Sequence, residues 1–205
     1  MPRFEDLRFV RGSGNYTDDI SVPDQAYAAF VRAPHAHARI VSIDTSAARR
    51  QRGVLAVLVG EDYVSDGHIG MAHLPNPADA NDVTVSTFAP TPERKILDQL
   101  QLPLAVGDVR FVGEAVAVIV AESFAAARDA AEAVAVEYEV LPAVTDVMEA
   151  LADGAPTIWA EASGNVALDC AFGDAAAVEA AIKDAHLVVD ATIRNQRTIS
   201  AFIEP

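Results

Sequence analysis

The first half of the chain carries short apolar or alternating runs that predict β-strands. Residues 26–32 (AYAAFVR) follow turn residues and have strand-like composition, and residues 39–43 (RIVSI) alternate as a half-buried strand does. Residues 54–59 (VLAVLV) are continuously apolar and largely β-branched, which predicts a buried strand. Residues 44–52 begin with side-chain oxygens able to cap a short helix, and Gly53 follows where a left-handed residue would end it. The pattern predicts a strand–helix–strand unit.

A second unit of the same kind follows a strand expected at residues 109–111. Residues 115–121 (AVAVIVA) predict a buried strand, and Ser123 can cap an alanine-rich helix that runs to Glu132. Residues 134–140 (VAVEYEV) alternate between apolar and polar side chains, as a half-buried strand does. Strands and helices that alternate in this way predict an α+β or α/β fold.

Between the two units, residues 64–104 are of a different character. Five prolines interrupt this stretch, and asparagine and aspartate lie between them. That composition is typical of a long surface loop or of an arm that docks onto a partner. The prolines and the missing periodicity predict the most mobile, or most partner-dependent, part of the chain.

The last third returns to alternating strands and helices. A short helix is expected at residues 146–151 and a turn at residues 153–156; a second helix, capped by Asp174, should extend to Ile182. Strands are expected at residues 165–172, 187–194 and 198–203. Because a final strand with nothing after it leaves an unpaired edge, the sequence is expected to be cut from something larger and to self-associate or need a partner.

Composition narrows the possible functions. The formal charge is -15, so an acidic surface would repel a polyanion, and nucleic-acid binding is not expected. The first residues lack an apolar signal segment, and the chain has no apolar run of membrane-spanning length; the expected location is cytoplasmic. Cys170 is the single cysteine, which by itself cannot hold an iron–sulfur cluster or a structural zinc. Its apolar neighbours predict a buried small residue.

Several residues suggest chemistry, but each has a structural explanation that fits better. Gly12-Ser13-Gly14 lacks the preceding strand of a phosphate loop and is interpreted as a turn. His35 and His37 could be two metal ligands, but no third ligand is near in sequence, and a packing or interface role is favoured. Asp18-Asp19 and Asp44 are assigned to turns and caps. We therefore expect no catalytic residue and no metal ligand in this chain.

Four stretches of the chain form a recognisable series. They are GSGNYTDDI at residues 12–20, YAAFVRAPHAHARI at 27–40, RFVGEAVAV at 110–118 with VEYEVLPAV at 136–144, and GNV at 164–166 leading through Gly173-Asp174 to FIEP at 202–205. In this order and spacing, which cover nearly the whole chain, they resemble the N-terminal part of the large, molybdopterin-binding subunit of the xanthine dehydrogenase, aldehyde oxidase and aerobic carbon monoxide dehydrogenase family.

The resemblance implies an α/β hammerhead domain over residues 1–145, followed by a linker and the truncated start of the molybdenum-cofactor-binding domain over residues 146–205. It implies that the complete enzyme oxidises an aldehyde, a purine-like heterocycle or carbon monoxide at a molybdopterin centre. Electrons would then pass to [2Fe-2S] clusters and FAD on partner subunits or domains. The resemblance also places Gln196 beside the ligands of the metal, although Gln196-Arg197-Thr198 is one place out of register and lacks the glutamate–histidine pair that follows in xanthine-type members.

Most of the family's cofactor-binding groups, and the glutamate that acts as base, would follow Pro205; Glu204 is interpreted as structural. The isolated chain is therefore expected to be inactive and to hold no cofactor. The alternative is a stand-alone interaction or scaffolding module from a shortened or split gene, with no redox role.

Overall fold

The structure is a computed structural model that describes residues 6–72, 95–97, 99–169 and 174–194. Internal contacts divide the chain into two units. One is compact and spans Ala26–Ala171; the other combines Met1–Gln25 with Phe172–Pro205. We describe the two units separately.

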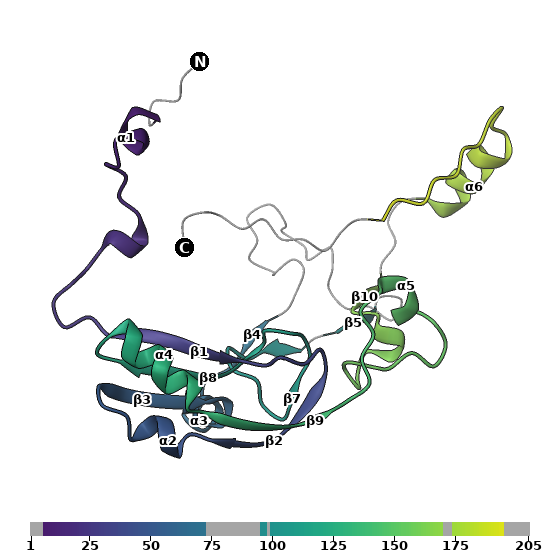
Figure 1. Cartoon of the computed structure of the whole chain (residues 1–205). Coiled ribbons are helices and arrows are strands. Elements are labelled where there is room, and N and C mark those ends of the chain that lie inside the picture. The colour runs from purple at the N-terminus through teal and green to yellow at the C-terminus, as the bar shows by residue number, and fades with distance from the viewer. Residues whose placement is uncertain (1–5, 73–94, 98, 170–173, 195–205) are drawn as a thin grey trace. The chain divides into compact units, whose positions relative to one another are not determined.

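The compact unit is built on two three-stranded antiparallel sheets (Figure 1). In the first sheet the central strand β8 (Ala115–Ala121) lies between β1 (Tyr27–Arg32) and β3 (Val54–Val59). In the second sheet β2 (Ala38–Asp44) is central and lies between β7 (Asp108–Val109) and β9 (Ala135–Val140). Strands that are far apart in the sequence therefore pair directly.

Both strand–helix–strand units predicted from the sequence are present, and each crosses from one sheet to the other. The first runs from β2 through α2 (Ser46–Arg49) to β3, and the second runs from β8 through α4 (Phe124–Glu132) to β9. Between any two paired strands of one of these sheets, the chain therefore contributes at least one strand to the other sheet. The predicted α+β class is confirmed.

Two groups of buried residues form the core of this unit. Val57, Ile119 and Ala130 join the first sheet to α4, and Ala48 of α2 packs with them. The second group joins Val109 and Val116 to the buried residues Ala33, Ala38 and Ala105, and partly buried side chains of both sheets pack against it. Alanine at these buried positions lets helix and sheet approach closely, as the alanine-rich sequence of α4 predicts.

The ends of α4 and α2 are set by hydrogen bonds between residues that are close in the sequence. The Ser123 side chain accepts a hydrogen bond from the Ala126 N–H at 3.2 Å and starts α4 where it is predicted. The helix after β2 is shorter than expected and ends at Arg49, although Gly53 adopts a positive φ of 83°. Asp44, predicted to be a cap, accepts from the Ser46 N–H at 2.8 Å, and this bond lowers the pKa of its carboxyl group.

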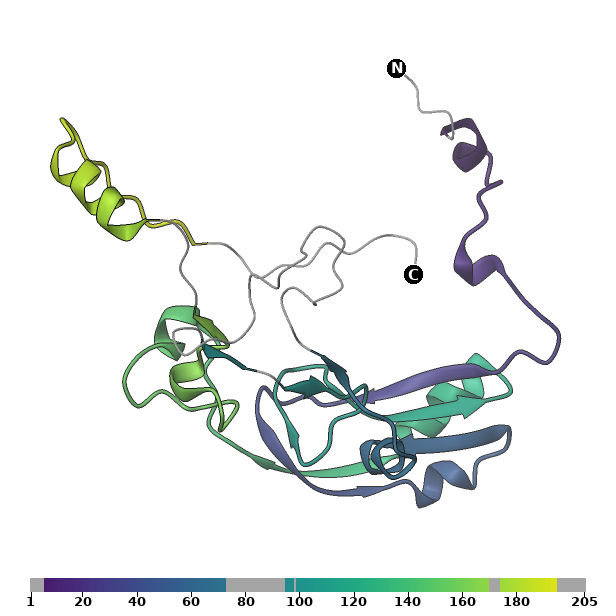
Figure 2. The same cartoon turned by 180° about the vertical axis from the view of Figure 1, so that it is seen from behind.

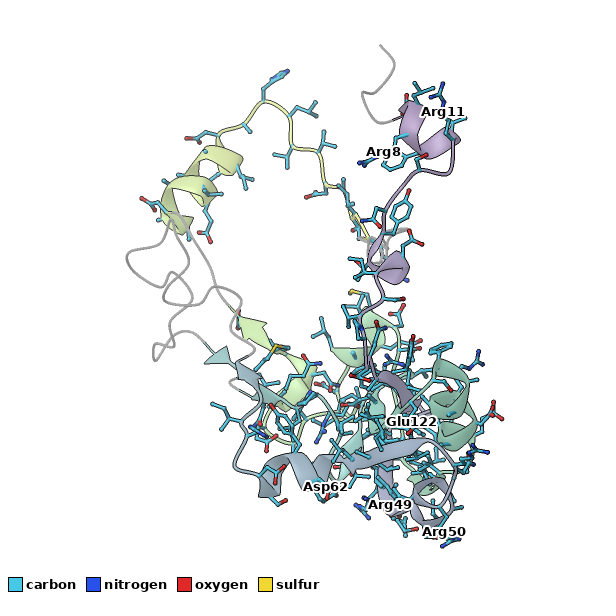
Figure 3. All side chains as sticks on the ribbon, turned by 90° about the vertical axis from the view of Figure 1, so that its left-hand side faces the viewer. Arg8, Arg11, Arg49, Arg50, Asp62 and Glu122 are labelled. Atoms are coloured by element: carbon cyan, nitrogen blue, oxygen red, sulfur yellow. The ribbon has the colours of Figure 1, made fainter. Side chains whose placement is uncertain are left out.

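A third short helix, α3 (Gly60–Ser65), continues directly from β3. Asp62 accepts a hydrogen bond from the Val59 N–H at 2.9 Å, and its carboxylate lies 4.0 Å from the Arg49 guanidinium. Figure 3 labels both residues, Arg49 at the end of α2 and Asp62 in α3 of the compact unit. Because both side chains are about half exposed, the ion pair contributes little stability.

The expectation of one long loop at residues 64–104 is wrong for part of its length. The described portion contains three short strands: β4 (Met71–Ala72), β5 (Lys95–Ile96) and β6 (Leu100–Gln101). β4 pairs with β6, and β5 pairs with β10 (Leu168–Asp169), both antiparallel (Figure 2). The prediction missed them because two-residue ladders depend on distant partners rather than on local periodicity. The prediction of mobility stays a prediction.

The segment after β9 begins as predicted. The helix α5 (Val147–Ala150) is capped by Asp146, whose carboxylate accepts from the Met148 and Glu149 N–H groups. The predicted turn at residues 153–156 contains Gly154 at a φ of 79°. The strand predicted at residues 165–172 is confirmed only at β10, because a 3-10 turn occupies Ser163–Asn165 and residues 170–172 lie outside the described residues.

The other unit contains α1 (Asp6–Val10), a 3-10 turn at Thr17–Asp19 and α6 (Ala175–Lys183). Asp174 caps α6 as predicted, accepting from the Ala177 N–H at 3.0 Å. The strand predicted at residues 187–194 is wrong as far as the structure describes it, since these residues pair with no described strand and are exposed. Residues 198–203 lie outside the described residues. No helix in the described ranges has the length and apolar composition to cross a membrane.

Candidate functional site

A pocket of about 500 Å³ opens beside the turn that leads into β8. Its wall combines three segments: the short strands near residue 100, the turn at residues 105–114, and the stretch after α5 that carries the single tryptophan. The volume lies within the range of ordinary ligand pockets, roughly 300–1,000 Å³. The lining residues are Leu97, Gln99, Gln101, Leu102, Ala105, Val106, Arg110, Phe111, Glu114, Ile158, Trp159 and Ala167.

Arg110 is the cation of this pocket. Its guanidinium carbon lies 3.8 Å from the centre of the Trp159 ring, and only 21% of the side chain is exposed. One terminal nitrogen donates to the Asp108 carbonyl at 3.1 Å, and the other lies 3.8 Å from the Asp108 carboxylate. The Nε atom is buried and has no hydrogen-bond partner among the described residues. Arg110 is therefore held by stacking and by Asp108 together.

Glu114 closes the turn that positions Arg110. Its carboxylate accepts a hydrogen bond from the Arg110 backbone N–H at 2.5 Å, across a loop in which Gly113 has a positive φ of 92°. Burial raises the pKa of the Glu114 carboxyl above its ordinary value; the Arg110 N–H, the Arg110 charge and the Phe111 N–H offset part of this rise. The RFVGE sequence is thus a turn closed by its own glutamate.

Asn165 fixes the segment that carries Trp159. Its side-chain oxygen accepts from the Ile158 N–H at 3.0 Å, and its amide nitrogen donates to the carbonyls of Ala150 and Pro156 at 3.1 and 2.9 Å. Its own backbone is left-handed, with a φ of 56°. Asparagine tolerates this conformation better than most residues and brings both a donor and an acceptor, so it suits this position.

The two histidines considered as metal ligands have packing roles. His37 is nearly buried, and its Nδ1 lies 2.9 Å from the Pro142 carbonyl oxygen. His35 packs edge-on against the Tyr138 ring, with 5.0 Å between ring centres. Both lie in the connection between β1 and β2 rather than on one strand face. They attach this connection to β9 and the residues just after it.

The other candidates from the sequence are not among the residues that line the pocket, and some of them lie outside the described residues. Gly12, at a φ of 68°, belongs to the turn that ends α1, where the Ser13 N–H donates to the Arg8 carbonyl. Asp19 accepts from the Tyr16 N–H at 3.0 Å, as a turn residue does. Cys170, Gln196 and Glu204 lie outside the described residues, so their assignments stay predictions.

Sequence reasoning missed the residues that build the pocket. Arg110 and Glu114 appeared only inside a family-like stretch, Asn165 only inside GNV, and Trp159 had no assignment. One signal was available: Gly164-Asn165 is a pair that favours left-handed backbone, and the only tryptophan lies six residues before it. No sequence rule, however, could place Trp159 against Arg110 across the fold.

The pocket does not match the requirements of a metal or pterin cofactor. No group of three or more His, Cys, Asp or Glu side chains able to hold a metal ion occurs in the described part of the chain. The guanidinium of Arg110 is already stacked and faces Asp108, and much of the remaining wall is apolar. The residues of this pocket therefore do not fit a metal ion or a pterin group.

Comparison with known proteins identifies the class. The family model described as "Aldehyde oxidase and xanthine dehydrogenase, a/b hammerhead domain" matches residues 11–90 and 78–142. The chain belongs to this family, which confirms the assignment made from its sequence motifs.

Two curated relatives and one solved structure illustrate the similarity. The carbon monoxide dehydrogenase large chain of Afipia carboxidovorans is 37% identical over 76% of this chain and 17% of its own length. The nicotine 6-hydroxylase large subunit of Paenarthrobacter nicotinovorans is 35% identical over 100% of this chain and 23% of its own length. Quinoline 2-oxidoreductase from Pseudomonas putida 86 superposes with a TM-score of 0.59, at 37% identity, over 77% of this chain and 18% of that one. The chain thus spans about a fifth of the length of these relatives.

Proposed function

We propose that this chain is the N-terminal, hammerhead-containing part of the large subunit of a molybdenum hydroxylase and that it is not catalytic alone. One observation carries the proposal: the nicotine 6-hydroxylase large subunit aligns with 100% of this chain while the alignment covers 23% of the relative. A chain that aligns throughout with a part of a larger subunit is best explained as the corresponding piece of such a subunit.

In this proposal the molybdopterin centre is held by residues of the remaining molybdenum-binding domain, and [2Fe-2S] clusters and FAD belong to partner subunits or domains. The complete enzyme would oxidise an aldehyde, a purine-like heterocycle or carbon monoxide in the cytoplasm. Residues 1–145 would form the hammerhead domain and residues 146–205 the linker and the start of the next domain. Gln196 is the one residue of this chain proposed to lie beside the ligands of the metal.

The pocket residues have a structural task in this proposal. Arg110 and Trp159 attach the stretch after α5 to the turn before β8, and Asn165 fixes the shape of that stretch by three hydrogen bonds. Since this stretch precedes the proposed cofactor-binding domain, its attachment would give that domain a defined starting point on the hammerhead. The geometry of the pocket supports a positioning role rather than catalysis.

The test is a chimera of the nicotine 6-hydroxylase large subunit in which this chain replaces the matching segment. We expect the chimera to assemble, to contain molybdenum and to regain hydroxylase activity, whereas the subunit with the segment deleted should do none of these. The unmodified relative, purified in parallel, is the positive control. A chimera that folds but stays free of molybdenum would contradict the proposal, as would stoichiometric molybdenum in the isolated 205-residue chain.

A further inference from the structure

The sheet β1–β8–β3 has two faces of different environment. One face carries Val57, Ile119 and Ala121, which are fully buried, and α4 covers it through Ala130. The strand register determines which side chains lie on the opposite face. Phe30 and Leu58 both pair with Val118, and Ala28 and Ala56 both pair with Val120, so these side chains form two rows across the sheet.

These six residues, which we call the open sheet face, are all apolar, and no described part of the chain covers them fully. Phe30 is 49% exposed and Leu58 is 42% exposed. Ala28 is exposed as well, and Ala56, Val118 and Val120 are only partly buried, whereas the alternate residues of the central strand are inaccessible. Val116 lies on the same side by alternation but is fully buried, so the open part of this face ends there. The members of the open sheet face are Ala28, Phe30, Ala56, Leu58, Val118 and Val120.

The second sheet of the same unit provides an internal comparison. Its outward side carries polar pairs: Arg39 donates to the Glu139 carboxylate at 2.7 Å, and the Ser42 hydroxyl lies 3.4 Å from the Glu137 carboxylate. An antiparallel sheet with one face in water normally shows such polar residues on that face. The first sheet instead has the continuous apolar runs typical of strands that are buried on both faces.

One end of the open sheet face carries a charge. The Arg32 guanidinium carbon lies 5.4 Å from the centre of the Phe30 ring, and the same group donates to the Gly113 carbonyl at 2.9 Å. An element that covers Phe30 would therefore meet a fixed cation with further donors. The complementary surface is apolar over most of its area and offers carboxylate or carbonyl oxygens at the Arg32 end.

We propose that the open sheet face is a domain interface, which in the complete large subunit is covered by an apolar-faced element from the part of the subunit that this chain lacks. This inference rests on the proposed function. The relatives have the residues to supply such an element, because the aligned region is only 17% and 23% of their length. A second copy of this chain fits less well, since each copy brings a formal charge of -15. Uniformly apolar surfaces are also typical of permanent rather than transient interfaces.

Leu58→Glu tests the inference, with Val41→Glu as the matched control. Val41 is 54% exposed and lies on a strand of the second sheet. In the isolated chain we expect each variant to keep its melting temperature to within about 2 °C, because neither side chain is buried there. In the nicotine 6-hydroxylase chimera, Leu58→Glu should lower the yield of molybdenum-containing protein about tenfold, because the interface would bury an unpaired charge. Val41→Glu should leave that yield unchanged.

Each other outcome overturns a defined part of the inference. A lower melting temperature of isolated Leu58→Glu would show that the face is already covered within this chain. Equal yields of the two chimera variants would show that no element covers the face in the assembled subunit. An isolated chain that sediments as a dimer, and that Leu58→Glu converts to a monomer, would identify a second copy as the occupant. Failure of the unsubstituted chimera to assemble would instead contradict the proposed function itself.

Discussion

Strand β3 (Val54–Val59) and residues 187–194 are both β-prone by composition, but their structures differ. VLAVLV and LVVDATIR are both rich in β-branched residues, and both predict strands. β3 pairs with β8 along its length, and Val57 is fully buried. Residues 187–194 pair with nothing in the described part of the chain, and Leu187 and Ile193 are 75% and 88% exposed. The difference teaches that a β-prone run becomes a strand only where another strand is supplied.

The largest expected effect tests whether stability follows pairing rather than composition. Ile119→Ala in the central strand should lower the free energy of unfolding by about 2–5 kcal/mol, because a fully buried side chain leaves a cavity. Ile193→Ala, the same change in the exposed run, should alter it by no more than about 0.5 kcal/mol. Urea denaturation followed by circular dichroism measures both. Similar losses would mean that residues 187–194 are packed in solution and would remove the contrast.

A second substitution separates backbone conformation from hydrogen bonding in the segment that carries Trp159. Asn165→Ala should cost about 2–4 kcal/mol, since three hydrogen bonds are lost and alanine disfavours a positive φ. Asn165→Gly should cost less, because glycine adopts this φ freely and only the hydrogen bonds are lost. Trp159 is the only tryptophan, so its fluorescence reports the segment directly. Equal costs would mean that the conformation itself contributes nothing.

A third substitution tests the stacking in the pocket. Arg110→Lys keeps the charge but loses the planar group that lies 3.8 Å from the Trp159 ring centre. We expect a loss of about 1 kcal/mol and a red shift of the tryptophan emission as the ring becomes more hydrated. Arg128→Lys is the control, because the Arg128 guanidinium carbon lies 6.0 Å from the centre of the exposed Phe124 ring. This variant should change neither the stability nor the tryptophan emission. An unchanged emission in Arg110→Lys would show that the stack does not hold the segment.

The smallest expected effect is a pH dependence carried by Glu114. Burial raises the pKa of this carboxyl in the folded chain, so the folded state binds the proton more tightly than the unfolded state does. Stability contributed by the protonated group is therefore present below the unfolded pKa, for which the ordinary value is 4.5, and is lost as pH rises through the folded pKa. Relative to Glu114→Gln, the wild-type chain should lose stability over that window.

Melting temperatures of both proteins from about pH 4 to about pH 7 measure this effect, because the titration of the other carboxylates cancels in the difference. A difference that does not change with pH would mean that Glu114 is as well solvated in the folded chain as in the unfolded one. A difference of opposite slope would mean that the bond from the Arg110 N–H outweighs burial.

The sequence predicts the elements whose signals are local and misses those that depend on distant partners. α4 begins after Ser123 and β8 spans Ala115–Ala121 as predicted, because a capping side chain and an unbroken apolar run are written in adjacent residues. The two-residue strands β4, β5 and β6 escaped prediction because each exists only through a partner that is distant in the sequence. The stack of Trp159 on Arg110 escaped for the same reason. Family motifs included Arg110, Glu114 and Asn165 but could not say what each of them does.

The position of β8 has a consequence for how the chain is made. β1 and β3 do not pair with each other; both pair with β8, which follows them in the sequence. During synthesis from the N-terminus, at about 5–20 residues per second, two apolar strands therefore leave the ribosome and wait several seconds for their common partner. A nascent chain stalled before Ala115 would expose both of them. Chaperone contact is accordingly expected to be greatest over that interval and to fall once Ala121 has emerged.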